Sequence, residues 1–205
     1  MIYAPSRKSN SLQVANAQVS NGKLSLSLEP SIDLGFAATT ITQHPELPIL
    51  YVSTNRGNED ECPGAIIMLK EAGHEVIPFT FKHGYSYLSL DRNSGYLLGC
   101  NYGDGFVDVY SLKQDGMIDK HVAGLAEGRK AAHCVLPSPD NRFVYIPYVK
   151  DNNALYQYTF DDQTGQLTSL DPKNANPPEG TGPRHMAYHP SKPFVYFSNE
   201  QGLGV

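Results

Sequence analysis

The stretch Ser-Pro-Asp-Asn-Arg-Phe-Val-Tyr-Ile, residues 138–146, joins a tight turn to a short apolar strand. Related stretches occur at 44–52, 91–98 and 189–197. Equivalent places in the four copies are held by Tyr51, Leu98, Tyr145 and Tyr196. The chain is therefore built from a unit of about 50 residues, a length within the range of known structural repeats.

A repeat of this length, made of short apolar strands and turns, is typical of a β-propeller, in which each repeat forms one four-stranded blade. In the third copy, alternating apolar and polar residues predict strands over 132–136, 143–148, 154–160 and 166–170, separated by turn-forming residues. No segment shows convincing helical periodicity. The sequence thus predicts an all-β fold of four-stranded antiparallel blades.

The same pattern predicts one propeller domain over residues 1–205, with three complete blades between two partial ones. The expected ranges are 1–30 (partial), 36–81, 85–123, 131–171 and 184–205 (partial). Propellers commonly close by pairing incomplete end blades, because closure removes exposed strand edges. We therefore expect a piece of a larger propeller, and a small closed ring with one strand to spare is the alternative.

Composition excludes several classes of protein. A formal net charge of −5 provides no basic surface for nucleic acid. No apolar run approaches the roughly 20 residues of a transmembrane helix, and the N-terminus lacks the pattern of a secretory signal. The 3 cysteines are widely separated and match neither a zinc site nor a disulfide framework. We predict a cytoplasmic protein that acts on a small molecule, without a nucleic-acid or membrane partner.

Aligning the copies places a set of residues at one rim of the propeller. Thr39, His133 and Arg184 each lie six residues before the repeated proline, and Gly84 is the counterpart in the remaining copy. These positions begin the innermost strands, which run in the same sense around the channel. His133 and Arg184 are therefore expected to be neighbours on adjacent blades.

The hairpin that follows Arg184 adds a carboxylate. A turn centred near Lys192 would place Glu200 opposite Arg184, with Cβ atoms about 4.5 to 5.5 Å apart. His133, Arg184 and Glu200 would then supply a base or acid, a fixed cation and a carboxylate, which can activate water and hold an anionic substrate. The alternative is a cross-strand ion pair beside a packed histidine.

Other candidates are weaker. His185 and His189 cannot share a metal ion, because their Cα atoms would be about 13 Å apart in a strand. His189 precedes a repeated proline, as His44 does, so turn structure explains both. Cys134 points to the opposite face from His133. Asn101 or Tyr102, after a second strand, is a candidate lining residue of the channel.

Several motifs together carry a family resemblance. They are Ala132-His133-Cys134 before 138–142, Asp171-Pro172, Gly180-Thr181-Gly182-Pro183-Arg184-His185-Met186, His189-Pro190, Asn199-Glu200, and the segment from Asn101 to Tyr110. In these motifs the chain resembles the seven-bladed propeller lactonase family. That family includes the bacterial 6-phosphogluconolactonase of propeller type and the fungal carboxy-cis,cis-muconate cyclase.

The resemblance implies a ring of seven blades, of which about four are present. It also implies a site at the channel mouth with His133, Arg184 and Glu200 as catalytic residues. A further family arginine from a later blade has no counterpart before residue 205. Tyr87 stands where many relatives carry a histidine. We expect substrate contacts from His185, Asn199, Tyr87 and Asn101.

The leading hypothesis is hydrolysis of a small anionic lactone, 6-phosphogluconolactone, to 6-phosphogluconate in the pentose phosphate pathway. Glu200 or His133 would be the general base, and Arg184 would stabilise the oxyanion or hold the anionic group. No metal or other cofactor is required. The alternatives are a muconate-type lactonizing cyclase, with the same acid and base, and a non-catalytic binding scaffold, because this fold hosts many functions.

Overall fold

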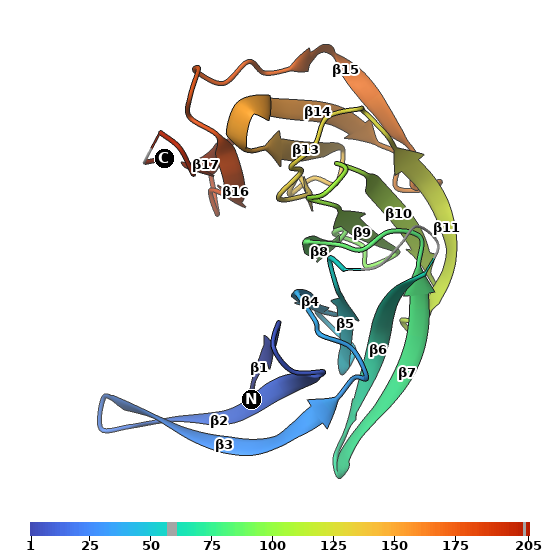
Figure 1. Cartoon of the computed structure of the whole chain (residues 1–205), viewed down its shortest axis with the longest axis vertical. Helices are drawn as coiled ribbons and strands as arrows, with labels where there is room; N and C mark the ends of the chain where they lie inside the picture. Colours follow the sequence, from blue (N-terminus) through green and yellow to red (C-terminus); the bar gives the residue numbers. More distant parts are fainter. Residues whose placement is uncertain (57–60, 203) are drawn as a thin grey trace.

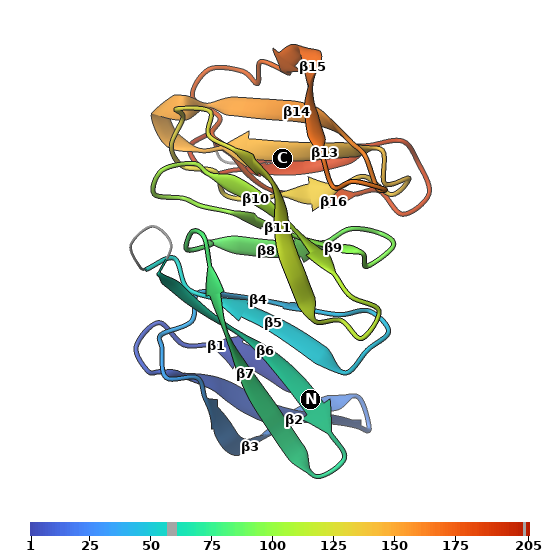
Figure 2. The same ribbon diagram turned by 90° about the vertical axis from the view of Figure 1, so that its right-hand side faces the viewer.

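The computed structural model describes residues 1–56, 61–202 and 204–205. In these residues the chain forms β-strands and one short 3-10 turn, Lys150–Asn152. The strands make five antiparallel sheets that follow one another in an arc (Figure 1). Turned by 90°, the same sheets are stacked layer on layer (Figure 2). The predicted all-β fold of antiparallel blades is confirmed, and no described helix is long and apolar enough to cross a membrane.

The five sheets follow the order of the chain. The first contains β1 (Ile2–Pro5), β2 (Ser11–Ser20) and β3 (Lys23–Asp33). The second contains β4 (Thr40–Gln43), β5 (Ile49–Ser53), β6 (Cys62–Lys70) and β7 (Gly73–Phe81). The third contains β8 (Tyr87–Leu90), β9 (Tyr96–Cys100), β10 (Val107–Leu112) and β11 (Ile118–Leu125). The fourth contains β12 (Leu136–Pro137), β13 (Phe143–Tyr148), β14 (Ala154–Phe160) and β15 (Leu167–Asn174), and the fifth β16 (Pro183–Tyr188) and β17 (Val195–Asn199).

The repeated turn has a local cause in its first residue. In two copies this residue is a histidine before proline, and its Nδ1 accepts backbone N–H groups of the turn. His44 accepts from the residues two and three positions later, and His189 does the same. Asp91 and Ser138 replace the imidazole with an oxygen that accepts from the first residue of the next strand. Each copy thus satisfies its own turn, as expected for His44 and His189.

Packing between neighbouring sheets buries both faces of the central strands. Every residue of β5 is buried. Tyr51 packs into the core shared with the third sheet, whereas Leu50 and Val52 pack against the first, because successive strand residues point to opposite faces. A third core lies between the third and fourth sheets, around Leu98 and Val144. The sheets therefore stack face to face like blades.

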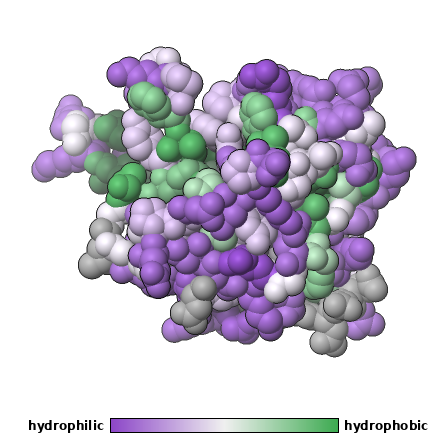
Figure 3. All heavy atoms as spheres, turned by 90° about the horizontal axis from the view of Figure 1, so that it is seen from above, coloured by the Kyte–Doolittle hydropathy of each residue, from purple (hydrophilic) through white to green (hydrophobic). Residues whose placement is uncertain are grey.

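The end sheets expose apolar surface. The first sheet, of three strands, and the fifth, of two, lie at the two ends of the arc (Figure 1). One face of each sheet therefore has no neighbouring sheet to pack against. The exposed large apolar side chains include Leu24, Leu26 and Leu28 of β3, together with Phe194 and Tyr196. Figure 3 shows one face of the molecule, on which such apolar areas interrupt a mostly polar surface.

Candidate active site

Three predicted residues meet where the fourth and fifth sheets adjoin. Arg184 is the second residue of β16, His133 lies in the extended segment before β12, and Glu200 follows β17 directly. The Arg184 Nε–H donates to His133 Nε2 at 3.0 Å. The same nitrogen lies 2.8 Å from Oε2 of Glu200. A single guanidinium nitrogen thus links an imidazole and a carboxylate.

The strand register behind this contact differs from the prediction. The structure pairs Tyr188 with Val195 and, after an irregularity, Pro183 with Asn199. The ladder is therefore shifted by one residue or more, and the prediction that Arg184 lies opposite Glu200 was wrong. The two side chains still meet because Glu200 lies just beyond the strand end, where its backbone N–H donates to the carbonyl of Gly182 at 2.8 Å.

Protonation assigns different roles to the two groups beside Arg184. Burial, followed by the charges of Arg184 and His185, lowers the pKa of His133 to about 4. His133 is therefore neutral at pH 7, and its Nε2 lone pair is engaged by Arg184. The Glu200 side chain is about one-third exposed, at 32%. Glu200 is thus the better placed of the two to accept a proton from water.

Of the residues expected to contact the substrate, His185 lies close to His133, and Tyr87 lies beside His185. The His185 ring lies edge-on to the His133 ring, with centroids 4.8 Å apart, and 6.0 Å from the ring of Tyr87. Burial and the Arg184 charge lower the pKa of His185. Burial also raises the pKa of the Cys134 thiol to about 11, so this neighbour of His133 is not a thiolate nucleophile at neutral pH.

Asn101 and Asn199 were also predicted to contact the substrate, and for both residues this stays a prediction. The Asn101 amide is buried and occupied: Nδ2 donates to the carbonyl of Gly84 at 2.5 Å, and Oδ1 accepts from the backbone N–H of Asp104 at 2.6 Å. Asn199 precedes Glu200 in the chain and lines a different cavity, beside Pro177.

The structure adds Tyr102, Gln201 and Lys150 to the residues that the sequence predicts for the site. Tyr102, which the sequence offers only as an alternative to Asn101, lies edge-on to His133, with centroids 5.6 Å apart. Gln201 donates from Nε2 to Glu200 Oε1 at 3.1 Å. Its Oε1 accepts the backbone N–H of Lys150 at 3.1 Å. Their place in the repeat could have identified them, since each of the three residues follows the second strand of a blade.

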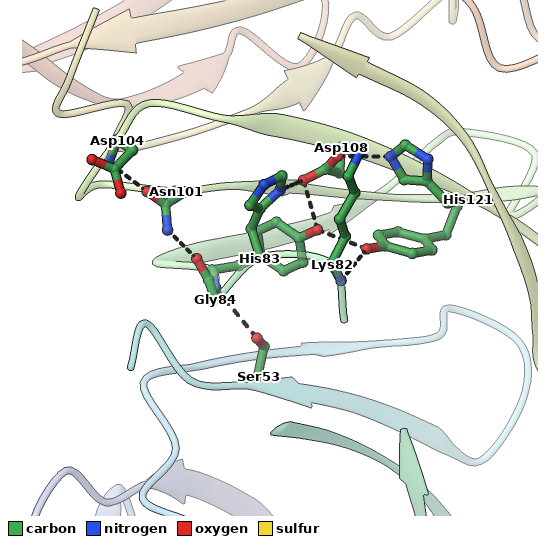
Figure 4. Close-up of polar contacts among 10 residues, drawn as sticks. Ser53, Lys82, His83, Gly84, Asn101, Asp104, Asp108 and His121 are labelled. Carbon is green, nitrogen blue, oxygen red and sulfur yellow. Dashed lines mark hydrogen bonds and ion pairs between the residues drawn. The ribbon is translucent and has the colours of Figure 1, made fainter. Parts of the chain in front are cut away.

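A buried carboxylate with three side-chain partners lies in the third sheet (Figure 4). Asp108 on β10 is 1% exposed in its side chain. Its Oδ2 accepts from His83 Nδ1 at 2.6 Å and from the Tyr85 hydroxyl at 2.8 Å. Its Oδ1 accepts from His121 Nε2 at 2.7 Å.

The surroundings of Asp108 point to a structural role. The Tyr85 hydroxyl also bonds to that of Tyr110 at 2.9 Å. The Tyr110 hydroxyl in turn accepts the backbone N–H of Lys82 at 2.9 Å. The network therefore ties the connection between β7 and β8 to the outer strands β10 and β11. His83 and His121 lie on opposite sides of Asp108 (Figure 4), and no metal-binding group of three His, Cys, Asp or Glu side chains exists among the described residues.

The lowered pKa of His133 predicts how stability depends on pH. The unfolded chain binds a proton at an ordinary histidine pKa near 6.5, whereas folded His133 does so only near pH 4. Between these values the unfolded state binds more protons, so stability is lost as pH falls through this window. His133→Gln is expected to reduce the loss. Urea unfolding at pH 7 and pH 5 checks this, and an equal loss in variant and parent would contradict it.

Comparisons with known proteins place the chain among lactonases. The family model described as "Lactonase, 7-bladed beta-propeller" matches residues 1–205. The 6-phosphogluconolactonase of Cronobacter sakazakii is 37% identical over 138 residues, which cover 67% of this chain and 39% of that protein. The 6-phosphogluconolactonase of an Enterobacter species is 28% identical over 212 residues, which cover 100% of this chain and 59% of that protein. The chain thus spans well under two thirds of these relatives.

Solved structures show the same fold. The periplasmic gluconolactonase PpgL of Pseudomonas aeruginosa superposes with a TM-score of 0.77 at 19% identity. The match covers 97% of this chain and 60% of PpgL. A second structure, from Bacteroides fragilis, gives a TM-score of 0.76 at 16% identity over 97% of this chain and 60% of that one.

Proposed function

Because the chain belongs to the seven-bladed β-propeller lactonase family, we propose that it contributes to the hydrolysis of a sugar-acid lactone, 6-phosphogluconolactone. The observation that carries the proposal is the contact of one Arg184 nitrogen with both His133 and Glu200. Relatives named 6-phosphogluconolactonase support the choice of substrate. A compact group of cation, carboxylate and neutral imidazole suits attack of water on an ester carbonyl.

The proposed reaction assigns a step to each side chain. Glu200 takes a proton from water, and the hydroxide adds to the lactone carbonyl carbon. Arg184 stabilises the negative charge that develops on the carbonyl oxygen. The bond between the carbonyl carbon and the ring oxygen then breaks, and the proton on Glu200 passes to the ring oxygen, which leaves as an alcohol. His133 acts as a positioning residue, because its Nε2 holds the guanidinium in place.

The proposal also covers the cofactor requirement, the substrate and the cellular compartment. General-base and electrostatic catalysis by these side chains requires no added metal or cofactor. The small anionic lactone is the proposed partner. The cytoplasm is the proposed compartment, where cysteines remain reduced; Cys62, Cys100 and Cys134 are all buried.

The test measures turnover of freshly prepared 6-phosphogluconolactone by the purified chain, against the spontaneous rate. We expect an acceleration that Arg184→Ala reduces by about 100-fold or more. Turnover that survives this substitution unchanged would sink the site assignment. Conversion of carboxy-cis,cis-muconate instead would establish the cyclase alternative. A folded chain that turns over neither compound would favour the alternative of a non-catalytic binding scaffold.

A further inference from the structure

Lys150 is tied to the proposed catalytic carboxylate through one side chain. Gln201 accepts the backbone N–H of Lys150 at 3.1 Å and donates to Glu200 at 3.1 Å. Lys150 begins the 3-10 turn between β13 and β14. The residue is therefore held at the rim on which Arg184 and Glu200 meet.

The Lys150 side chain and His133 both contact the ring of Tyr102. Its ammonium nitrogen lies 5.3 Å from the centroid of the Tyr102 ring, a distance at which a cation is attracted to the ring face. The same ring contacts His133 edge-on at 5.6 Å. Tyr102 thus contacts both a cation and the histidine that positions Arg184.

The backbone at Lys150 is unusual for its residue type. Its φ of 56° lies in the left-handed region, which lysine adopts far less readily than glycine or asparagine. Conformations of this kind persist where the surroundings enforce them, and they are concentrated at functional sites. The fold keeps a lysine here although glycine would adopt this backbone without strain.

The charges at this rim leave a role for a cation beyond Arg184. The Arg184 Nε is engaged by His133 and Glu200, and the proposed reaction places Arg184 at the carbonyl oxygen of the substrate. Asp104, in the same loop as Tyr102, is paired with Lys130 at 3.4 Å, which offsets its repulsion of an anion. A phosphate at the far end of a sugar lactone would need its own partner.

We propose that Lys150, positioned over Tyr102, binds the phosphate of a phosphorylated sugar lactone or of its hydrolysis product. This inference rests on the proposed function for the identity of the substrate. Its consequence is specificity: the chain would distinguish phosphorylated from unphosphorylated sugar acids through Lys150. The Tyr102 ring would hold the Lys150 ammonium near the sugar through their contact.

The experiment compares the binding of 6-phosphogluconate and gluconate to the purified chain by titration calorimetry. For Lys150→Met we expect the affinity for 6-phosphogluconate to fall by about 10- to 100-fold, the range for loss of a charged hydrogen bond. Affinity for gluconate should be unchanged. Lys150→Arg should retain most of the binding. Lys192→Met, in the turn at the other end of β16 and β17, is the matched control and should change neither affinity.

A second variant guards against misfolding. Lys150→Gly removes the charge but suits the left-handed backbone, so its melting temperature should not fall, while it should lose the same affinity for 6-phosphogluconate. Retained affinity in Lys150→Met and Lys150→Gly, an equal loss for gluconate, or an equal loss in Lys192→Met would each overturn the inference. Lactone hydrolysis without a preference for phosphate would overturn it while the proposed function stands. Binding of 6-phosphogluconate that depends on Lys150, without hydrolysis of the lactone, would support the inference and contradict the proposed function.

Discussion

Glu200→Gln is expected to lower kcat for lactone hydrolysis by about 10²- to 10⁴-fold, the usual contribution of a positioned general base. Glutamine keeps the shape of the side chain but cannot accept the proton of the attacking water. Because the pKa of His133 is lowered to about 4 and its Nε2 is occupied by Arg184, His133 is a poor replacement for the carboxylate. Initial rates with saturating 6-phosphogluconolactone measure the effect.

The same substitution should barely change stability, which separates catalysis from folding. The Arg184 and Glu200 side chains are 43% and 32% exposed, and ion pairs at this exposure contribute about 0 to 1 kcal/mol. Glu75→Gln is the matched control, because Glu75 forms an exposed pair with Lys70 at 2.6 Å and should affect neither property. A Glu200→Gln chain with parental kcat would show that another group is the base.

Asp108→Asn is expected to lower the free energy of unfolding by about 1 to 3 kcal/mol, the cost of leaving a buried hydrogen-bond donor without a partner. The carboxylate accepts from His83, His121 and Tyr85, and all three donors need an acceptor. An asparagine offers one oxygen and turns an NH₂ group toward one of the donors. That donor is left without a partner in a buried site.

Urea denaturation at pH 7, followed by far-ultraviolet circular dichroism, measures this loss. Asp119→Asn is the matched control, because Asp119 is an exposed residue of the adjacent strand β11 and surface substitutions usually stay within about 0.5 kcal/mol. Equal stability of the two variants would show that the Asp108 network does not hold the blade together. A chain that fails to fold only with Asp108→Asn would agree with the prediction.

Much of the fold follows from local patterns. The turn between the first two strands recurs because its first residue accepts backbone N–H groups within a few positions, as at His44 and Ser138. Alternation of apolar residues identifies strands without knowledge of their neighbours. The innermost strand of the fourth sheet was predicted over 132–136, whereas β12 covers only Leu136–Pro137 with an isolated bridge at Ala132. Strand limits depend on partner strands, and no local pattern records them.

The candidate site shows the same division. Aligning the repeats was sufficient to bring His133 and Arg184 to one rim, because equivalent positions in successive blades adjoin. The register of β16 and β17 was missed, since it depends on the hydrogen bonds of the 189–194 turn. The buried environment of Asp108 was missed too: its partners come from 25 residues earlier and 13 residues later in the chain.

The sequence by itself determined the repeat, the strand and turn chemistry of each unit, and the equivalent places of His133 and Arg184 in the repeat, because all of these arise from residues a few places apart. Tertiary structure alone decided which nitrogen of Arg184 meets His133 and Glu200. It also set the low pKa of His133 and placed Lys150 over Tyr102. Those properties depend on distance, burial and charge between different blades, and such contacts exist only after the sheets have packed.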